Sequence, residues 1–255
     1  MGYAIRPLSF GEILDGAFAL LRARWRAILV ATALLGVPAV AFQQLFLLPM
    51  VTAAATGGFL AGIVALAAQT LVTMLTSIPS SAAVSVILAD TYLGRPCDFA
   101  HVAERTRGVL WGRLYTDLFL FAYTGIGFLF FLVPGLWLSF HYAVVGPVVV
   151  IERRAGPAAL RRSYELVRGA RGRTALLMLT AISLTAALIG APIWVFSGVP
   201  VAKQGMIIAA ASLGGLYLNA AFTVLYFDRV CRREAFDIEH LAQLVEARDA
   251  VPMES

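Results

Sequence analysis

Long apolar runs separated by arginine-rich segments constrain the fold of this chain more than any other feature. Each run approaches or exceeds the roughly 20 residues that a helix needs to cross a bilayer. Of the 255 residues, 60% are hydrophobic and only 14% are charged, which is too little polar surface to cover a soluble domain of this length. The sequence therefore predicts an all-α protein whose apolar side chains face lipid or one another.

The apolar runs predict a polytopic bundle of about six spanning helices, flanked by cytoplasmic amphipathic helices. The six runs cover residues 27–48, 59–89, 114–133, 136–151, 174–196 and 206–227. Pro79 is expected to divide the long second run into a span and a shorter helical continuation, and Pro134 and Gly135 to form the turn after the third. The whole chain is interpreted as one membrane domain, with an N-terminal interfacial helix over 1–26, the bundle over 27–228 and a C-terminal helix over 229–255.

The distribution of charge orients this bundle. All nineteen arginines precede the first run, follow the last, or lie between the second and third or the fourth and fifth. These segments share one side of a six-span bundle, and Lys203 is the only charge expected on the other side. The positive-inside rule makes the arginine side cytoplasmic. We therefore expect a multi-pass protein of the plasma or inner membrane with both termini in the cytoplasm.

Two terminal segments are expected to be helical. Ser9 and Glu12 fit a capping box, and apolar residues recur at helical spacing after them. This pattern predicts either a helix lying in the membrane interface or a short cytosolic helix packed on the bundle. Near the other end, Asp237 is expected to cap a separate acidic helix that packs on the basic loops or on a partner.

The segment between the fourth and fifth runs is the strongest candidate for binding. It carries seven arginines against two acids: Arg153, Arg154, Arg161, Arg162, Arg168, Arg171 and Arg173. Such a potential attracts anionic lipid headgroups by about 1 kcal/mol per basic residue near the surface. The alternative is purely topological, with the arginines only holding the loop inside. Nucleic acid is not an expected partner, because no basic run is interleaved with aromatic residues.

Catalytic chemistry finds no support in the sequence. The three histidines lie far apart without metal-ligand spacing, and no nucleophile elbow, P-loop or zinc-protease pattern occurs. We therefore expect a non-enzymatic chain without metal or cofactor.

Three polar residues within the runs are candidate intramembrane sites, because ionisable groups at that depth are functional hypotheses by default. Asp117 lies four residues after Arg113 and is expected to form an ion pair with it. His141 is expected to be neutral and hydrogen-bonded, and too far from the level of Asp117 to pair with it. Asn219 is expected to hydrogen-bond between helices.

Three stretches carry a family resemblance: RPLSFGEILDG over 6–16, GPAALRRSYELVRG over 156–169 and LYFDRVCRREAFD over 225–237. With the hydropathy pattern, they resemble the glycerophosphoryl diester phosphodiesterase membrane-domain family over almost the whole chain. In the enzymes that give this family its name, such a membrane region is fused to a soluble, metal-dependent barrel. A barrel of that kind needs roughly 250 residues of its own. The resemblance therefore implies a stand-alone membrane module without that activity.

The sequence leaves three functions open. The first is a non-catalytic module that binds anionic headgroups, a partner protein or a second copy of itself through its basic cytoplasmic face. The second is a permease-like subunit for a small solute or a lipid, in which proline-interrupted helices line a cavity. The third is a membrane-embedded lipid-modifying enzyme, which requires Asp90, Asp117 and Asp228 to converge in space.

Overall fold

The computed structural model describes residues 8–95, 98–130, 132–195 and 200–249, and every element among them is helical. This confirms the all-α prediction. In chain order the elements are α1 (Phe10–Ala23), α2 (Trp25–Ala31), the π-helical η1 (Thr32–Gly36), α3 (Val37–Phe42), the π-helical η2 (Gln43–Leu47), α4 (Leu48–Ala55), α5 (Phe59–Tyr92), α6 (Phe99–Phe130), α7 (Leu132–His141), α8 (Val145–Glu152), α9 (Pro157–Val167), α10 (Arg171–Val195) and α11 (Pro200–Asp249).

Four helical segments among the described residues are long and apolar enough to cross a membrane. They are Trp25–Phe46, Phe59–Tyr92, Arg171–Gly190 and Lys203–Arg233. The expected third span lies in α6, where Arg113 and Asp117 make the helix more polar, and its last residues have side chains outside the described set. The expected fourth span is split into α7 and α8 by a turn over 142–144, which leaves a shorter apolar stretch, Trp137–Glu152. The structure therefore supports a multi-span helical protein, and the predicted number of six spans is not confirmed by the described residues.

Three helices continue where the sequence predicted a break or a turn. One is α7 (Leu132–His141), which contains Pro134 and Gly135, so the predicted turn at these two residues is wrong. Pro79 lies inside α5, a single helix of 34 residues, so the predicted division there is wrong. A proline removes one backbone hydrogen bond, and hydroxyl groups nearby can compensate. Around this proline, three hydroxyls of α5 donate to nearby backbone carbonyls, none of which is the Leu75 carbonyl that Pro79 leaves without its usual donor: Thr76 to Val72, Ser77 to Met74 and Ser81 to Ile78.

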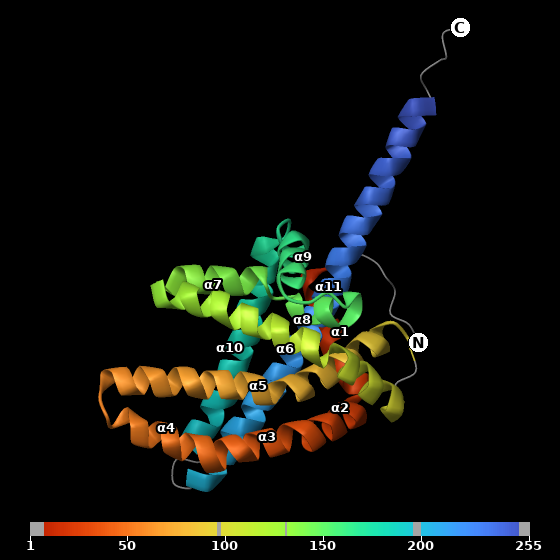
Figure 1. The fold of residues 1–255 in the computed structure, drawn as a ribbon. Helices are drawn as coiled ribbons and strands as arrows, with labels where there is room; N and C mark the ends of the chain where they lie inside the picture. Colours follow the sequence, from red (N-terminus) through yellow and green to blue (C-terminus); the bar gives the residue numbers. More distant parts are fainter. Residues whose placement is uncertain (1–7, 96–97, 131, 196–199, 250–255) are drawn as a thin grey trace.

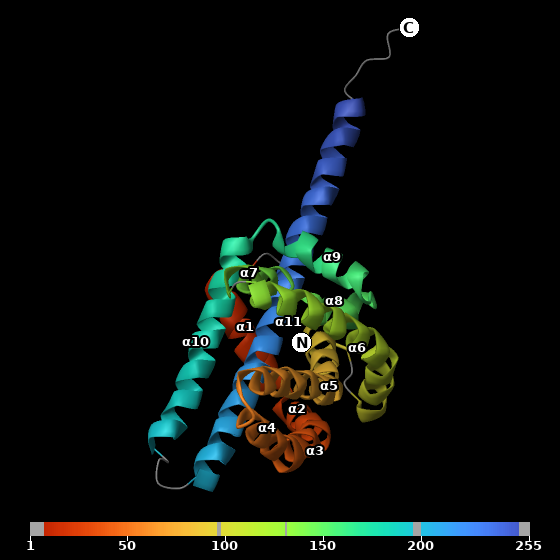
Figure 2. The same ribbon diagram turned by 60° about the vertical axis from the view of Figure 1, so that its left-hand side comes forward.

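The predicted C-terminal helix is not a separate element, because α11 runs unbroken for 50 residues and passes through Asp237. At 1.5 Å per residue it is about 75 Å long. Figures 1 and 2 show its last part, in dark blue, extending away from the rest of the molecule. The expected packing of this segment on the basic loops is therefore wrong, and its packing on a partner stays a prediction.

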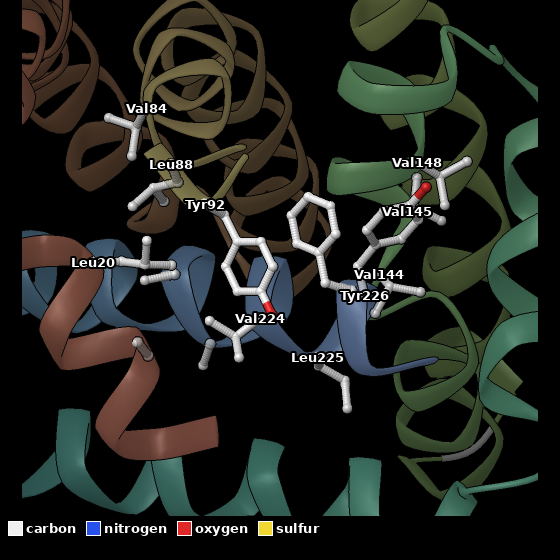
Figure 3. Close-up of a cluster of buried hydrophobic side chains, with 14 of the residues drawn as sticks. Leu20, Val84, Leu88, Tyr92, Val144, Val145, Val148, Val224, Leu225 and Tyr226 are labelled. Carbon is white, nitrogen blue, oxygen red and sulfur yellow. The ribbon is translucent and has the colours of Figure 1, made fainter. Parts of the chain in front are cut away.

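The helices form three hairpins that share one core. The α2–α4 segment pairs with α5, α6 with α7, and α10 with α11. In both views the α10–α11 pair runs across the other two (Figures 1 and 2). The hairpins meet where α1, the second half of α5, α8, α9 and the middle of α11 bury their apolar side chains. Figure 3 shows part of this core, in which the Tyr92 ring stacks on Phe227 with ring centroids 4.1 Å apart.

The far ends of the hairpins are open to their surroundings. Phe59 at the start of α5 is 83% exposed, and Met50 in α4 is 71% exposed. A soluble protein rarely leaves such large apolar side chains uncovered over a wide area. Lipid is the natural cover for this surface, and the protein core is concentrated at the opposite, arginine-bearing end.

The N-terminal helix α1 belongs to that core. Ser9 and Glu12 form the predicted capping box, with the Ser9 backbone N–H donating to the Glu12 carboxylate at 2.6 Å. The side chains of Ile13, Ala17 and Leu20 are fully buried, and α1 packs on α11 and α5. The apolar face of the helix thus contacts protein, as a helix packed on the bundle requires, and its position relative to the membrane interface stays a prediction.

Candidate functional site

The arginine-bearing segment is fixed to the core at the turn between α8 and α9. Arg153 ends α8 in the left-handed conformation (φ 54°), and Gly156 precedes α9 with φ 59°. A Cβ at Gly156 would lie 2.0 Å from the Tyr115 ring, so only glycine fits here. The Gly156 N–H also donates to the Thr116 hydroxyl at 2.8 Å. These contacts hold α9 against α6 and set the direction of the side chains that it presents.

Three of the seven candidate arginines are used to hold the fold together. Arg162 donates from Nε to both Glu152 oxygens, at 2.9 and 3.2 Å, and the Arg154 Nε lies 3.1 Å from the same carboxylate. The Tyr226 hydroxyl donates to Glu152 at 3.0 Å from α11. Arg173 donates to the backbone carbonyl of Leu8. These arginines therefore have partners within the protein.

The other four are exposed on one end of the molecule and form what we call the arginine patch: Arg153, Arg161, Arg168 and Arg171. The side chains of the first three make no hydrogen bond or ion pair with any residue that the structure describes. Arg171 makes one long hydrogen bond, at 3.4 Å, to the Tyr164 hydroxyl. Arg161 and Arg168 are separated by two helical turns and project from the same side of α9.

Sequence reasoning missed a second arginine cluster, around Asp228 in α11. The Asp228 carboxylate is fully buried and accepts hydrogen bonds from Arg229 at 2.6 Å and Arg232 at 2.9 Å. It also accepts from the Leu8 N–H at 2.8 Å, while Arg232 and Arg173 donate to the Leu8 carbonyl. We call this cluster the N-terminal latch, because it ties the segment before α1 to α10 and α11. The local sequence feature that could have predicted this cluster is Arg232, which follows Asp228 at the i,i+4 spacing of a helical ion pair.

The remaining acids do not converge into a reactive cluster. Asp90 contacts Arg105, and the Asp117 carboxylate lies 2.7 Å from the Arg113 Nε, as the spacing of that pair predicted. Asp90 and Asp117 are therefore each paired with a separate arginine, as Asp228 is with others. In the part of the chain that the structure describes, no three His, Cys, Asp or Glu side chains could hold a metal ion together. The convergence that a lipid-modifying enzyme requires is thus missing from the described residues.

His141 has partners other than Asp117. Its Nδ1 lies 2.7 Å from the Trp137 carbonyl, and its ring packs between Trp137 and Tyr164, with centroids 4.0 and 5.1 Å away. No hydrogen bond reaches the buried His141 Nε2 from the described residues. His141 is thus a packed and hydrogen-bonded residue, as expected.

Asn219 lies where two cavities meet. Its side chain joins α11 to α5 through the Ser85 hydroxyl at 3.0 Å and the Ser81 carbonyl at 3.5 Å, which is the predicted contact between helices. The first cavity, about 380 Å³, lies between α6, α7, α8, α10 and α11 and includes Arg113 and Asp117. The second, about 550 Å³, lies between the η1–η2 region, α5 and α11. Asn219 lines both, and His141 lines neither.

No protein-family model matches the chain, and comparisons with curated proteins and with solved structures give no significant match. The resemblance to the glycerophosphoryl diester phosphodiesterase membrane-domain family therefore stays a prediction. Two of the stretches that carry it, 6–16 and 225–237, meet at the N-terminal latch.

Proposed function

We propose that this chain is a non-catalytic integral membrane module that binds anionic lipid headgroups at its arginine-bearing end. One observation carries the proposal: the arginine patch is exposed and has no acidic partner, while the buried acids are paired with other arginines. A guanidinium group without a protein partner is free to bind a phosphate, which its planar donors match with two parallel hydrogen bonds.

The proposed setting is a plasma or inner membrane crossed about six times, with α6 and the α7–α8 pair as the third and fourth crossings. Both termini would lie in the cytoplasm, which the one-sided distribution of arginine supports. The patch would then lie at the level of the cytoplasmic headgroups. Four arginines at about 1 kcal/mol each would supply a total of about 4 kcal/mol toward anionic lipid. A membrane module of the resembled family would fit this role.

Lipid retention measured by native mass spectrometry tests the proposal. The purified chain would be released from micelles that contain equal amounts of an anionic and a zwitterionic phospholipid. We expect a variant with the four patch arginines replaced by glutamine to lose its preference for the anionic lipid. Exposed arginines outside the patch supply a control with the same change in charge: Arg22, Arg24, Arg26 and Arg107 replaced by glutamine.

The outcomes separate the competing interpretations. If the control loses the preference equally, the arginines act only through the general charge that orients the protein. If the patch variant keeps the preference, the patch binds no headgroups, and a protein partner or a second copy becomes the better hypothesis for its exposed charge.

A permease-like subunit is the second candidate, and the two cavities that meet at Asn219 favour it. Cavities between interrupted helices are typical of transporters. Transbilayer movement of a fluorescent phospholipid in proteoliposomes tests it for lipid. We expect faster movement than in protein-free vesicles and slower movement with Asn219→Leu; equal rates with and without protein would refute lipid transport.

A further inference from the structure

The second cavity differs in chemistry from the arginine-bearing end. It lies between three segments that are long and apolar enough to cross a membrane, yet hydroxyl and amide side chains from three directions line it. Thr32 and Gln43 come from η1 and η2, Thr73 and Ser80 from α5, and Asn219 from α11. Every polar residue in its described lining is uncharged. A volume of about 550 Å³ falls within the size range of small-molecule sites.

One buried hydroxyl in this lining lacks a hydrogen-bond partner among the described residues. The Gln43 amide donates to the Thr76 hydroxyl at 2.6 Å and accepts from the Thr73 hydroxyl at 3.4 Å, so both the nitrogen and the oxygen of this amide have partners. The Thr32 Oγ1 is buried and makes no hydrogen bond with any described residue. Leaving a buried hydroxyl unsatisfied destabilises a protein. Rotation of the Thr32 side chain about χ1 would bring this hydroxyl to the cavity, where a hydrogen bond to a bound group would remove the penalty.

The backbone around the cavity is also irregular. Two π-helical turns, η1 and η2, flank α3, and Thr32, Gly36 and Gln43 from these turns line the cavity. Such turns are rare and occur frequently at functional sites. Across the cavity, α5 contains Pro79, flanked by Ser77 and Ser80, which both line the cavity. In helices at membrane depth, irregular backbone is tolerated where it faces protein or a cavity.

We propose that this cavity binds the polar end of an uncharged amphiphile, a molecule with an alkyl chain and hydroxyl or amide groups. A charged group would lose its hydration here without a counter-ion, which is costly. A pure hydrocarbon would leave the polar lining without partners. The alkyl chain of the ligand would contact an apolar wall formed by Val37, Val40 and Leu216. This site does not depend on the arginine patch, so either proposal can fail without the other.

Equilibrium binding of radiolabelled 1-decanoylglycerol to the full chain in nanodiscs tests this inference. Decyl phosphate and decane serve as competitors of the same chain length. We expect unlabelled 1-decanoylglycerol to displace the label, and the other two to displace it much less. Ser77→Leu, which places an alkyl group in the cavity, should abolish binding.

Thr32→Val distinguishes a ligand-binding hydroxyl from a structural one. It should weaken binding of 1-decanoylglycerol by about fivefold, the effect of one lost hydrogen bond. The melting temperature without ligand should stay the same or rise, because an unsatisfied hydroxyl is replaced by a methyl group. Thr70→Val is the matched control, since Thr70 is exposed on α5 and bonds to its own backbone at Leu66; it should leave binding unchanged.

Three results would overturn the inference. If decane displaced the labelled 1-decanoylglycerol equally well, the cavity would recognise only hydrocarbon, as a space filled by lipid tails does. Tighter binding of decyl phosphate would make it an anion site. A Thr32→Val protein that binds normally but melts at a lower temperature would assign the hydroxyl to folding.

Discussion

Replacing Asp228 by asparagine should release the N-terminal segment from the bundle. The Asp228 carboxylate is fully buried and neutralises Arg229, whose side chain is only 9% exposed. Breaking a buried ion pair by removing one partner costs about 3–5 kcal/mol, because the other charge is left uncompensated. Arg232 is 38% exposed and can turn toward water. We therefore expect the lower end of this range, about 3 kcal/mol.

This loss should be local to α1, because the latch holds both backbone groups of Leu8. Amide hydrogen exchange reports such local opening. A loss of about 3 kcal/mol corresponds to exchange faster by roughly two orders of magnitude. We expect this acceleration in α1, with a smaller change in α5 and α10.

Asp15→Asn provides the control, since Asp15 is an exposed acid on α1 and its replacement removes the same charge. A second variant, Asp228→Asn with Arg229→Gln, removes the uncompensated charge as well and should recover part of the protection. If Asp228→Asn exchanges no faster than Asp15→Asn, the latch does not stabilise α1 and the reasoning is refuted.

Two further predictions concern the turn before α9 and the end of α11. Gly156→Ala should lower the free energy of unfolding by about 2 kcal/mol or more, and the melting temperature with it, because the new Cβ would overlap the Tyr115 ring at a positive φ. Gly169→Ala is the control, because open space surrounds Gly169, and it should change the melting temperature little. Truncation after Arg233 should leave the melting temperature of the remaining chain within one or two degrees of the full-length value, because the removed part of α11 projects away from the other helices (Figures 1 and 2); a large drop would show that this part stabilises the bundle.

Contacts within one helical turn were the part of the structure that the sequence predicted best. The capping box of Ser9 and Glu12 and the ion pair of Arg113 and Asp117 both join residues three or four apart. Such contacts depend on helix geometry alone, so a pattern in the sequence is enough to find them. The contact between Leu8 and Asp228 joins residues 220 apart, and no local pattern determines which distant backbone group a buried carboxylate will meet.

Local signals for helix ends were less reliable. Pro79 and Asp237 both favour a boundary, and both lie inside continuous helices. The penalty for a proline within a helix is a few kcal/mol, which tertiary packing can offset. The opposite failure occurred in the fourth apolar run, where the turn over 142–144 interrupts a segment whose composition predicted one helix. Composition determines whether a segment can face lipid, but packing determines where its helix stops.

The candidate binding site shows why a count of charges was insufficient. Arg161 and Arg162 are neighbours in the sequence, but successive residues on a helix point about 100° apart. One therefore faces outward without a partner, while the other is bound to Glu152 inside the fold. Neutralising all seven arginines of the segment would remove headgroup contacts and structural ion pairs together, and a loss of binding would then be ambiguous. Neutralising only the four patch arginines leaves the Glu152 and Asp228 clusters intact, so a loss of anionic lipid can be assigned to recognition rather than to unfolding.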